Sequence, residues 1–168
     1  GHQALPAKDP AVVNAFKAKA AELSRVEQSA SNAMGELLSE FGAMRKAIGK
    51  MNVADEAWLD RIGKMEKTIK DLQRQLSGDP IKVQLDMDLT PSVSDRIGRV
   101  IYESKYSSSD PTGTHQKSLG IAEEQLKSIV SHLKGILEKD IVDLRADLQK
   151  AGAPYTPNAI PSFKGITD

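Results

Sequence analysis

Apolar residues recur at alternating steps of three and four along the first third of the chain. The series comprises Phe16, Ala20, Leu23, Ala30, Met34, Leu37, Phe41, Met44 and Ile48, with Glu27 as its polar member. This heptad spacing is typical of a helix that packs against other helices along one seam. Asp9 and Pro10 are suited to cap and begin such a helix, and Gly49 marks its end. We expect a helix of about 40 residues, about 60 Å long.

A second seam with the same spacing follows over residues 55–77. Its members are Trp58, Ile62, Met65, Ile69, Leu72 and Leu76. Gly78 stands where a helix commonly ends in the left-handed conformation, and Pro80 prevents the helix from continuing. The outer face carries acid–base pairs such as Glu66/Lys70, each of which stabilises a helix by about 0.3 kcal/mol.

Residues 79–90 follow a different period. The apolar residues here are Ile81, Val83, Leu85, Met87 and Leu89. They alternate with polar residues, which is the pattern of an extended chain, and no second segment shows this period to pair with it. We predict an extended connector that lies on the bundle with its apolar side inward. At about 3.3 Å per residue it reaches about 40 Å, enough to run back along the second helix.

The second half of the chain carries two more helical patterns. Thr90 and Pro91 signal the start of a shorter helix that ends near Tyr106. Its expected inward residues are Val93, Ile97, Val100 and Ile101. After a loop, Thr114 is suited to cap a last helix, which Gly152 ends.

The last helix has the most regular pattern in the chain. Its seam consists of three triplets, each displaced by eleven residues from the one before: Leu119, Ala122 and Leu126; Val130, Leu133 and Leu137; Ile141, Leu144 and Leu148. An eleven-residue repeat favours a nearly straight or slightly right-handed helix. Ile129 and Ile136 widen the apolar stripe, so we expect this helix to contact two neighbours.

Together these patterns predict an all-α protein. We expect an antiparallel helical bundle of four helices, two long and two shorter, over residues 9–152. Residues 1–8 are interpreted as a linker or a remnant of expression, and residues 153–168, which contain three prolines, as an extended tail. Because the chain opens on Gly1 without an initiator methionine, we expect a piece of a longer protein.

Composition narrows the classes of partner. The 168 residues include 23 basic and 23 acidic side chains, so neither nucleic acid nor an anionic membrane surface is an expected partner. The chain has no cysteine, which excludes disulfides and thiolate zinc sites. No apolar run approaches the roughly 20 residues that cross a bilayer. No phosphate-binding glycine loop and no Glu-x-x-His motif is present, so we expect no cofactor and no metal.

Paired carboxylates are the groups that glycoside hydrolysis needs. Asp86 and Asp88 share one side of the predicted connector, but the apolar alternation implies that this side faces water. Glu123 and Glu124 point about 100° apart on a helix, and Glu123 stands at ion-pair spacing from Lys127. We therefore assign no catalytic residue.

Glu27 is the candidate buried polar residue, because it occupies a seam position. A buried carboxylate needs a partner or a raised pKa, and such residues sometimes mark functional sites. Alternatively, Val26 turns into the seam and Glu27 extends to its edge.

The candidate interaction residues are Tyr155, Ile160 and Phe163, which are apolar groups in the proline-rich tail. They either pack back on the bundle or dock against another domain or partner. The residues leave both interpretations open.

Several stretches of the second half resemble a known family. They are Leu76-Ser77-Gly78-Asp79, Thr90-Pro91-Ser92-Val93-Ser94-Asp95-Arg96-Ile97, Ala122-Glu123-Glu124 and Ala151-Gly152-Ala153-Pro154-Tyr155-Thr156-Pro157. Together they are similar to the C-terminal helical region of bacterial sortilin-type (BNR-repeat) β-propeller, glycosyl-hydrolase-like proteins. The resemblance covers roughly half of the chain, and the closing motif is its most specific part. This chain departs from that motif at Tyr155, where the family has tryptophan, and at Asn158, where it has glycine.

The resemblance implies an exported parent protein with propeller repeats upstream of this chain. The implied location is periplasmic, cell-surface or secreted in a bacterium, and the implied partner is the upstream β-propeller domain. We therefore expect a non-catalytic helical accessory or interaction domain. One alternative is part of a glycan-cleaving hydrolase, which rests on the family's label alone. Another is a self-associating coiled-coil module, which predicts a dimer in sedimentation.

Overall fold

The computed structural model describes residues 9–85, 90–154 and 156 of the chain. Its helices are α1 (Pro10–Gly49), α2 (Glu56–Ser77), α3 (Pro80–Gln84), α4 (Val93–Lys105), α5 (Gly113–Gly135), the π-helix η1 (Ile136–Asp140) and α6 (Ile141–Lys150). The described ranges contain no strand, so the all-α prediction is confirmed.

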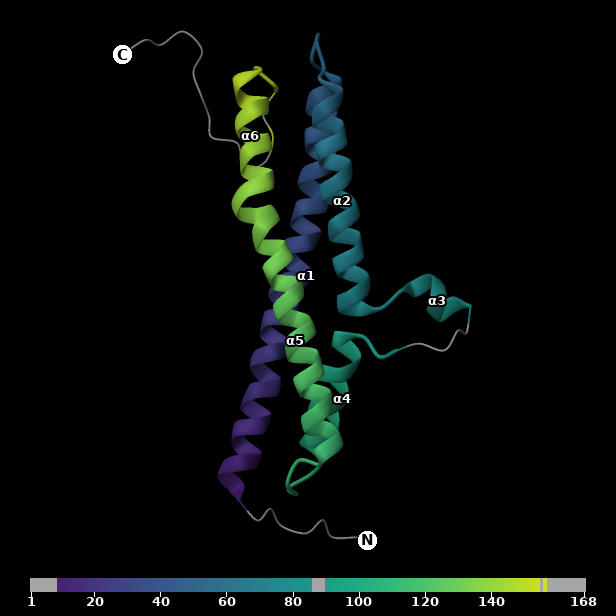
Figure 1. Ribbon diagram of the computed structural model, residues 1–168, viewed down its shortest axis with the longest axis vertical. Helices are drawn as coiled ribbons and strands as arrows, with labels where there is room; N and C mark the ends of the chain where they lie inside the picture. The colour runs from purple at the N-terminus through teal and green to yellow at the C-terminus, as the bar shows by residue number, and fades with distance from the viewer. Residues whose placement is uncertain (1–8, 86–89, 155, 157–168) are drawn as a thin grey trace, which may run out of the picture.

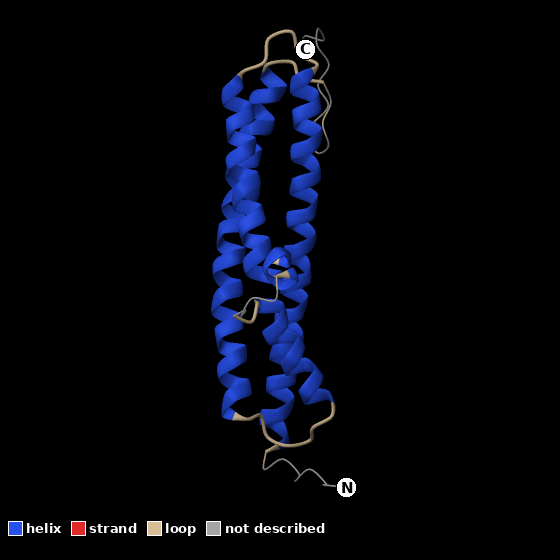
Figure 2. Ribbon diagram, turned by 90° about the vertical axis from the view of Figure 1, so that its right-hand side faces the viewer, coloured by secondary structure: helices blue, strands red, loops and turns tan. Residues whose placement is uncertain are grey.

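The helices pack as three columns along one long axis (Figures 1 and 2). α1 forms the first column; α2 and α4 follow one another down the second; and α5, η1 and α6 continue up the third (Figure 1). With 22 and 13 residues, α2 and α4 together nearly match the 40 residues of α1. The antiparallel bundle of two long and two shorter helices is therefore confirmed, with the two shorter helices sharing one column.

Local polar groups place the ends of α1 and α2 where the sequence predicts them. Asp9 accepts a hydrogen bond from the backbone N–H of Ala11 at 3.0 Å, and Asp55 accepts one from that of Ala57 at 2.8 Å. Gly78 ends α2 with a φ of 88°, a conformation that side chains with a Cβ rarely adopt.

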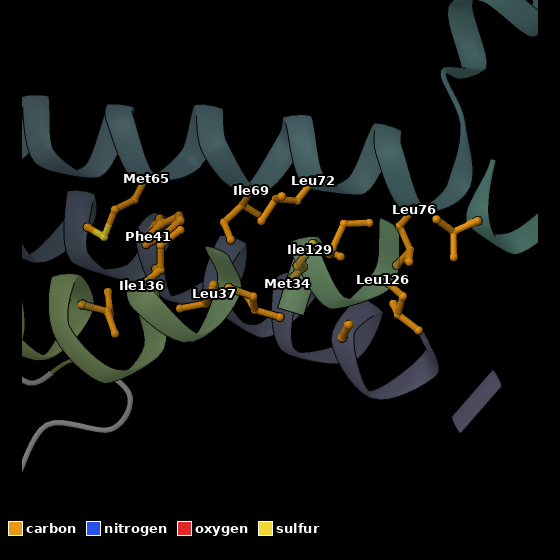
Figure 3. Close-up of a cluster of buried hydrophobic side chains, with 14 of the residues drawn as sticks. Met34, Leu37, Phe41, Met65, Ile69, Leu72, Leu76, Leu126, Ile129 and Ile136 are labelled. Atoms are coloured by element: carbon orange, nitrogen blue, oxygen red, sulfur yellow. The ribbon is translucent and has the colours of Figure 1, made fainter. Parts of the chain in front are cut away.

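One hydrophobic core runs between the columns (Figure 3). Its middle contains Met34, Leu37 and Phe41 from α1, Met65, Ile69, Leu72 and Leu76 from α2, and Leu126, Ile129 and Ile136 from the third column. The predicted seams of α1 and α2 are confirmed, except that Phe16, Glu27 and Trp58 are only half-buried.

Residues 79–85 of the connector do not form the extended segment that the sequence predicts, and residues 86–89 lie outside the described ranges. Pro80–Gln84 forms α3, and Asp79 caps it by accepting a hydrogen bond from the N–H of Ile81 at 3.0 Å. Asp79-Pro80 repeats the helix-start signal of Asp9-Pro10, and this local signal outweighs an alternation that has no partner strand. The connector also does not run back along the bundle, because α4 continues in the column of α2 (Figure 1).

Two predicted caps lie two residues away from the observed ones. Ser92 rather than Thr90 caps α4, and it forms a reciprocal capping box with Asp95. Thr112 rather than Thr114 caps α5, by accepting a hydrogen bond from a backbone N–H at 3.1 Å. In each case the capping hydroxyl accepts a hydrogen bond from the backbone N–H of the residue three positions later, which has no partner within the helix.

The inward face of α4 is narrower than predicted. Val93, Ile97 and Val100 are buried, as expected, but Ile101 is 38% exposed. Ile101 follows Val100 by about 100° around the helix and therefore points out of the core.

The seam of the third column changes its step at η1. The buried residues are Leu119, Ala122, Leu126, Ile129, Leu133, Ile136, Ile141, Leu144 and Leu148. Their spacing alternates between three and four up to Ile136 and then takes five residues to Ile141. A π-helical turn absorbs the extra residue, so the seam stays on one face. The eleven-residue triplets are therefore wrong at Val130, which is half-buried, and at Leu137, which is 36% exposed.

Candidate functional site

Glu27 lies at the edge of the core between α1 and α4. It is half-buried, and the hydroxyl of Ser94 donates a hydrogen bond to its Oε1. Val26 beside it packs against the core. Of the two interpretations of this position, the one with Val26 in the seam and Glu27 at its edge describes the structure.

The carboxylate enclosed in the bundle belongs instead to Glu40, which sequence analysis does not single out. Glu40 is 3% exposed and accepts hydrogen bonds from Arg145 Nε at 2.6 Å and from a terminal guanidinium nitrogen at 2.8 Å. The hydrogen bond to Glu40 raises the pKa of Arg145, against the opposing effect of burial. In the sequence, Glu40 precedes the seam residue Phe41 and Arg145 follows Leu144, but nothing local shows that the two meet across 105 positions.

Two further ion pairs join the columns in the same half of the bundle. Arg45 of α1 pairs with Glu66 of α2, and Arg61 of α2 pairs with Asp147 of α6 at 2.6 Å. Glu66 also contacts Lys70 at 3.2 Å, which is one of the predicted pairs. The hydrogen bond from Arg45, aided by Lys70, lowers the pKa of Glu66 despite the effect of burial. These charges neutralise one another between helices, which suits a structural role.

The carboxylate Glu123 and the histidine His132 also have structural partners. Glu123 binds Lys19 of α1 at 2.5 Å and Lys127 at 3.6 Å. The hydrogen bond from Lys19 lowers the pKa of Glu123, with burial opposing it. His132 Nδ1 donates to the carbonyl of Ser128 at 2.8 Å. Within the described part of the chain, no three His, Asp or Glu residues gather as a metal site.

Five of the residues considered as catalytic or interaction candidates lie outside the described ranges: Asp86, Asp88, Tyr155, Ile160 and Phe163. In the tail, Ala153 packs against the core and Thr156 is 6% exposed. Ala153 and Thr156 therefore stay on the bundle.

The chain leaves the bundle between α2 and α4 (Figures 1 and 2). The two ends of this connection are adjacent, because a Cβ placed on Gly78 would lie 3.9 Å from the Cβ of Ser92. Residues 79–91, which we call the α3 excursion, therefore join two points that already lie side by side. Connections of this length whose ends are close are frequently functional.

The α3 excursion presents apolar side chains to solvent. Ile81, Val83 and Leu85 are 66%, 61% and 65% exposed, and no residue of α3 is buried. Single exposed aliphatic residues are common on proteins, but three in one projecting segment make a candidate apolar contact surface. This surface offers a partner apolar area for docking.

No helix in the described ranges combines the length and apolar composition that crossing a membrane requires. Comparison of the chain with protein-family models, curated proteins and solved structures finds no match.

Proposed function

We propose that this chain is a non-catalytic helical accessory domain that docks on a partner through the α3 excursion. The carrying observation is the exposure of Ile81, Val83 and Leu85 at a point where the bundle needs no connection of that length. The partner we propose is the upstream β-propeller of the same exported protein, in the bacterial periplasm or at the cell surface. The propeller and the location rest on the resemblance of the second half of the chain.

The bundle holds both ends of the α3 excursion firmly. Gly78 ends α2 beside Leu76, which is 1% exposed, and the capping box of Ser92 begins α4. Val93 follows in the core. A projection anchored at both ends loses less conformational entropy on docking than a free segment does.

The size of the contact suits a partner in the same chain. Full burial of one Ile, Val or Leu side chain contributes about 1.5–3 kcal/mol. Because these three residues are only about two-thirds exposed, covering them contributes about 3–6 kcal/mol in total before the cost of association. Such a contact is weak between separate proteins. Covalent linkage provides an effective concentration of about a millimolar, which keeps even a weak contact formed.

Hydrogen exchange in the full parent protein and in this chain alone tests the proposal. We expect the amides of residues 81–85 to exchange more slowly in the parent. The triple substitution Ile81→Ser, Val83→Ser and Leu85→Ser should abolish that difference. A matched control, Val12→Ser, Val53→Ser and Val142→Ser, alters exposed residues elsewhere and should preserve it.

Equal exchange of these amides in the parent and in the isolated chain contradicts the docking role. Replacing residues 79–91 by Gly-Ser-Gly should lower helical content only by the 5 residues of α3, which separates loss of docking from unfolding. A dimer in sedimentation that the triple substitution dissociates assigns the surface to a second copy of this chain instead. Turnover of a glycan by the isolated chain overturns the non-catalytic assignment.

A further inference from the structure

A basic groove lies between α4 and α5, and Pro91 at the end of the α3 excursion forms part of its lining. It has a volume of about 470 Å³, and its lining includes Arg96 and Arg99 of α4 and Lys117 and Ser118 of α5. The carboxylate of Asp95 also lines it, but that group accepts the N–H of Ser92 at 2.9 Å in the capping box. The groove is therefore lined by three cationic side chains and a single carboxylate, and that carboxylate already accepts a hydrogen bond.

The arginines of the groove differ from the others in the chain. All seven arginines lie in the described ranges, and five of them pair with carboxylates: Arg25, Arg45, Arg61, Arg74 and Arg145. The two without a carboxylate partner among the described residues, Arg96 and Arg99, both line this groove. In a chain with equal numbers of acids and bases, these two arginines and Lys117 give the groove a local surplus of positive charge.

Arg96 has hydrogen-bond donors that the protein leaves unused. One terminal nitrogen donates to Ser118 Oγ at 3.4 Å, and Nε is buried without a partner in the described part of the chain. A guanidinium carries five N–H donors in a fork that matches the oxygens of a phosphate group. Nε has no exposed surface, so the donors of Arg96 that an oxyanion in the groove reaches are its terminal nitrogens, of which one makes only the long bond to Ser118.

We infer that this groove binds a phosphate monoester carried by a small organic molecule. Arg96, Arg99 and Lys117 hold the phosphate group, and the excess of two positive charges over the single carboxylate matches a dianion. The groove has the volume of a small-molecule site and exceeds what one phosphate ion fills. Pro91 and Ile121, which also line it, are placed to contact the carbon part of the ligand.

Titration followed by ¹H–¹⁵N spectra of the full chain tests this inference, at constant ionic strength. The probes are glucose 6-phosphate, inorganic phosphate and glucose. We expect saturable shifts around Arg99 and Lys117 with glucose 6-phosphate below about 10 mM, weaker binding of inorganic phosphate, and none of glucose. The double substitution Arg99→Gln and Lys117→Gln should weaken binding at least about tenfold, and both residues are exposed, so folding is not at risk.

The matched control is Lys46→Gln with Lys139→Gln, which removes the same charge from exposed positions elsewhere. It should bind as the unaltered chain does. Equal weakening in this control, or no saturable shift with either phosphate, overturns the inference. If inorganic phosphate binds as tightly as glucose 6-phosphate, the groove does not contact the carbon part of the ligand, and the proposal of an organic phosphate is overturned. None of these outcomes depends on the docking role of α3.

Discussion

At the scale of single residues, Glu40 and Arg145 show how a charge is kept inside this bundle. Glu40 has both carboxylate oxygens bonded to the guanidinium, while Arg145 keeps a quarter of its side chain exposed. This ion pair joins α1 to α6. A second ion pair, between Arg61 and Asp147, joins α2 to α6. Long arginine side chains thus link the columns in this half of the molecule.

We predict that Glu40→Leu and Arg145→Leu each lower the free energy of unfolding by about 3 kcal/mol, because each leaves a charge without its partner. The double substitution should recover most of this loss, since a buried pair and a well-packed apolar pair have similar stability. Urea unfolding of all four proteins in a double-mutant cycle measures the coupling. Glu22→Leu, which breaks the exposed pair with Arg25, should change stability by less than about 1 kcal/mol. Additive single effects in the cycle contradict the prediction.

The lowered pKa values of Glu66 and Glu123 predict how stability depends on pH. Both carboxyls titrate below their ordinary value of 4.5 in the folded chain, because lysine and arginine partners favour the charged form. Their contribution is therefore present above about pH 4.5 and is lost as the pH falls through the lowered folded values. Glu66→Gln with Glu123→Gln should flatten the fall in unfolding free energy between about pH 5 and pH 3.

Urea titrations at a series of pH values provide the measurement. Glu36→Gln with Glu138→Gln is the control, because both residues are exposed and lie away from these pairs. If the slope is the same for both double variants, the ion pairs do not set the acid sensitivity.

At the scale of elements, η1 reconciles two stretches of seam that are out of register by one residue. Ile136 and Ile141 are both buried although five residues separate them. In a regular helix the next seam position after Ile136 would be Asp140. The π-helical turn therefore prevents a charged residue from entering the core.

Deletion of Lys139 should convert η1 to regular α-helix without loss of the seam. Ile141 would then follow Ile136 by four residues, which continues the heptad spacing. We expect the thermal midpoint to stay within about 3 °C of its original value. Deletion of Gln125, an exposed residue in the regular part of α5, should lower it by more than about 10 °C, because it moves every later seam residue around the helix. Equal effects of the two deletions, measured by circular dichroism, would show that η1 does not absorb the extra residue.

At the scale of the whole molecule, one continuous core joins three columns that consist of different numbers of helices. The core extends from Ala20 in α1 to Leu148 in α6, and α5 contacts α1, α2 and α4. The third column thus ties the two halves of the second one together. A core shared in this way favours cooperative unfolding despite the length of the bundle.

We predict a single unfolding transition. Trp58, the only tryptophan, lies half-buried near the start of α2, so its fluorescence reports one end of the bundle. Circular dichroism at 222 nm reports all helices. Their midpoints in urea should coincide, whereas a fluorescence transition at lower urea would show that this end unfolds separately.

The sequence alone determined the helices and most of their inward residues. Heptad spacing and caps act within a few residues, so Asp9, Asp55 and Gly78 mark their helix ends with no information about the rest of the chain. The same reasoning failed for the connector, because alternation predicts an extended strand only where a partner strand stabilises it. It also failed at Leu137, where the choice between two overlapping apolar stripes depends on the neighbouring helices.

Only the tertiary structure decided what these helices present to a partner. The stacking of α2 on α4, which leaves α3 as a projection, follows from how two short helices match one long one. The enclosure of Glu40 and the surplus of charge around Arg96 likewise depend on which helix faces meet. Such pairings join residues far apart in the chain, and an amphipathic pattern specifies which face of a helix is buried but not which helix covers it.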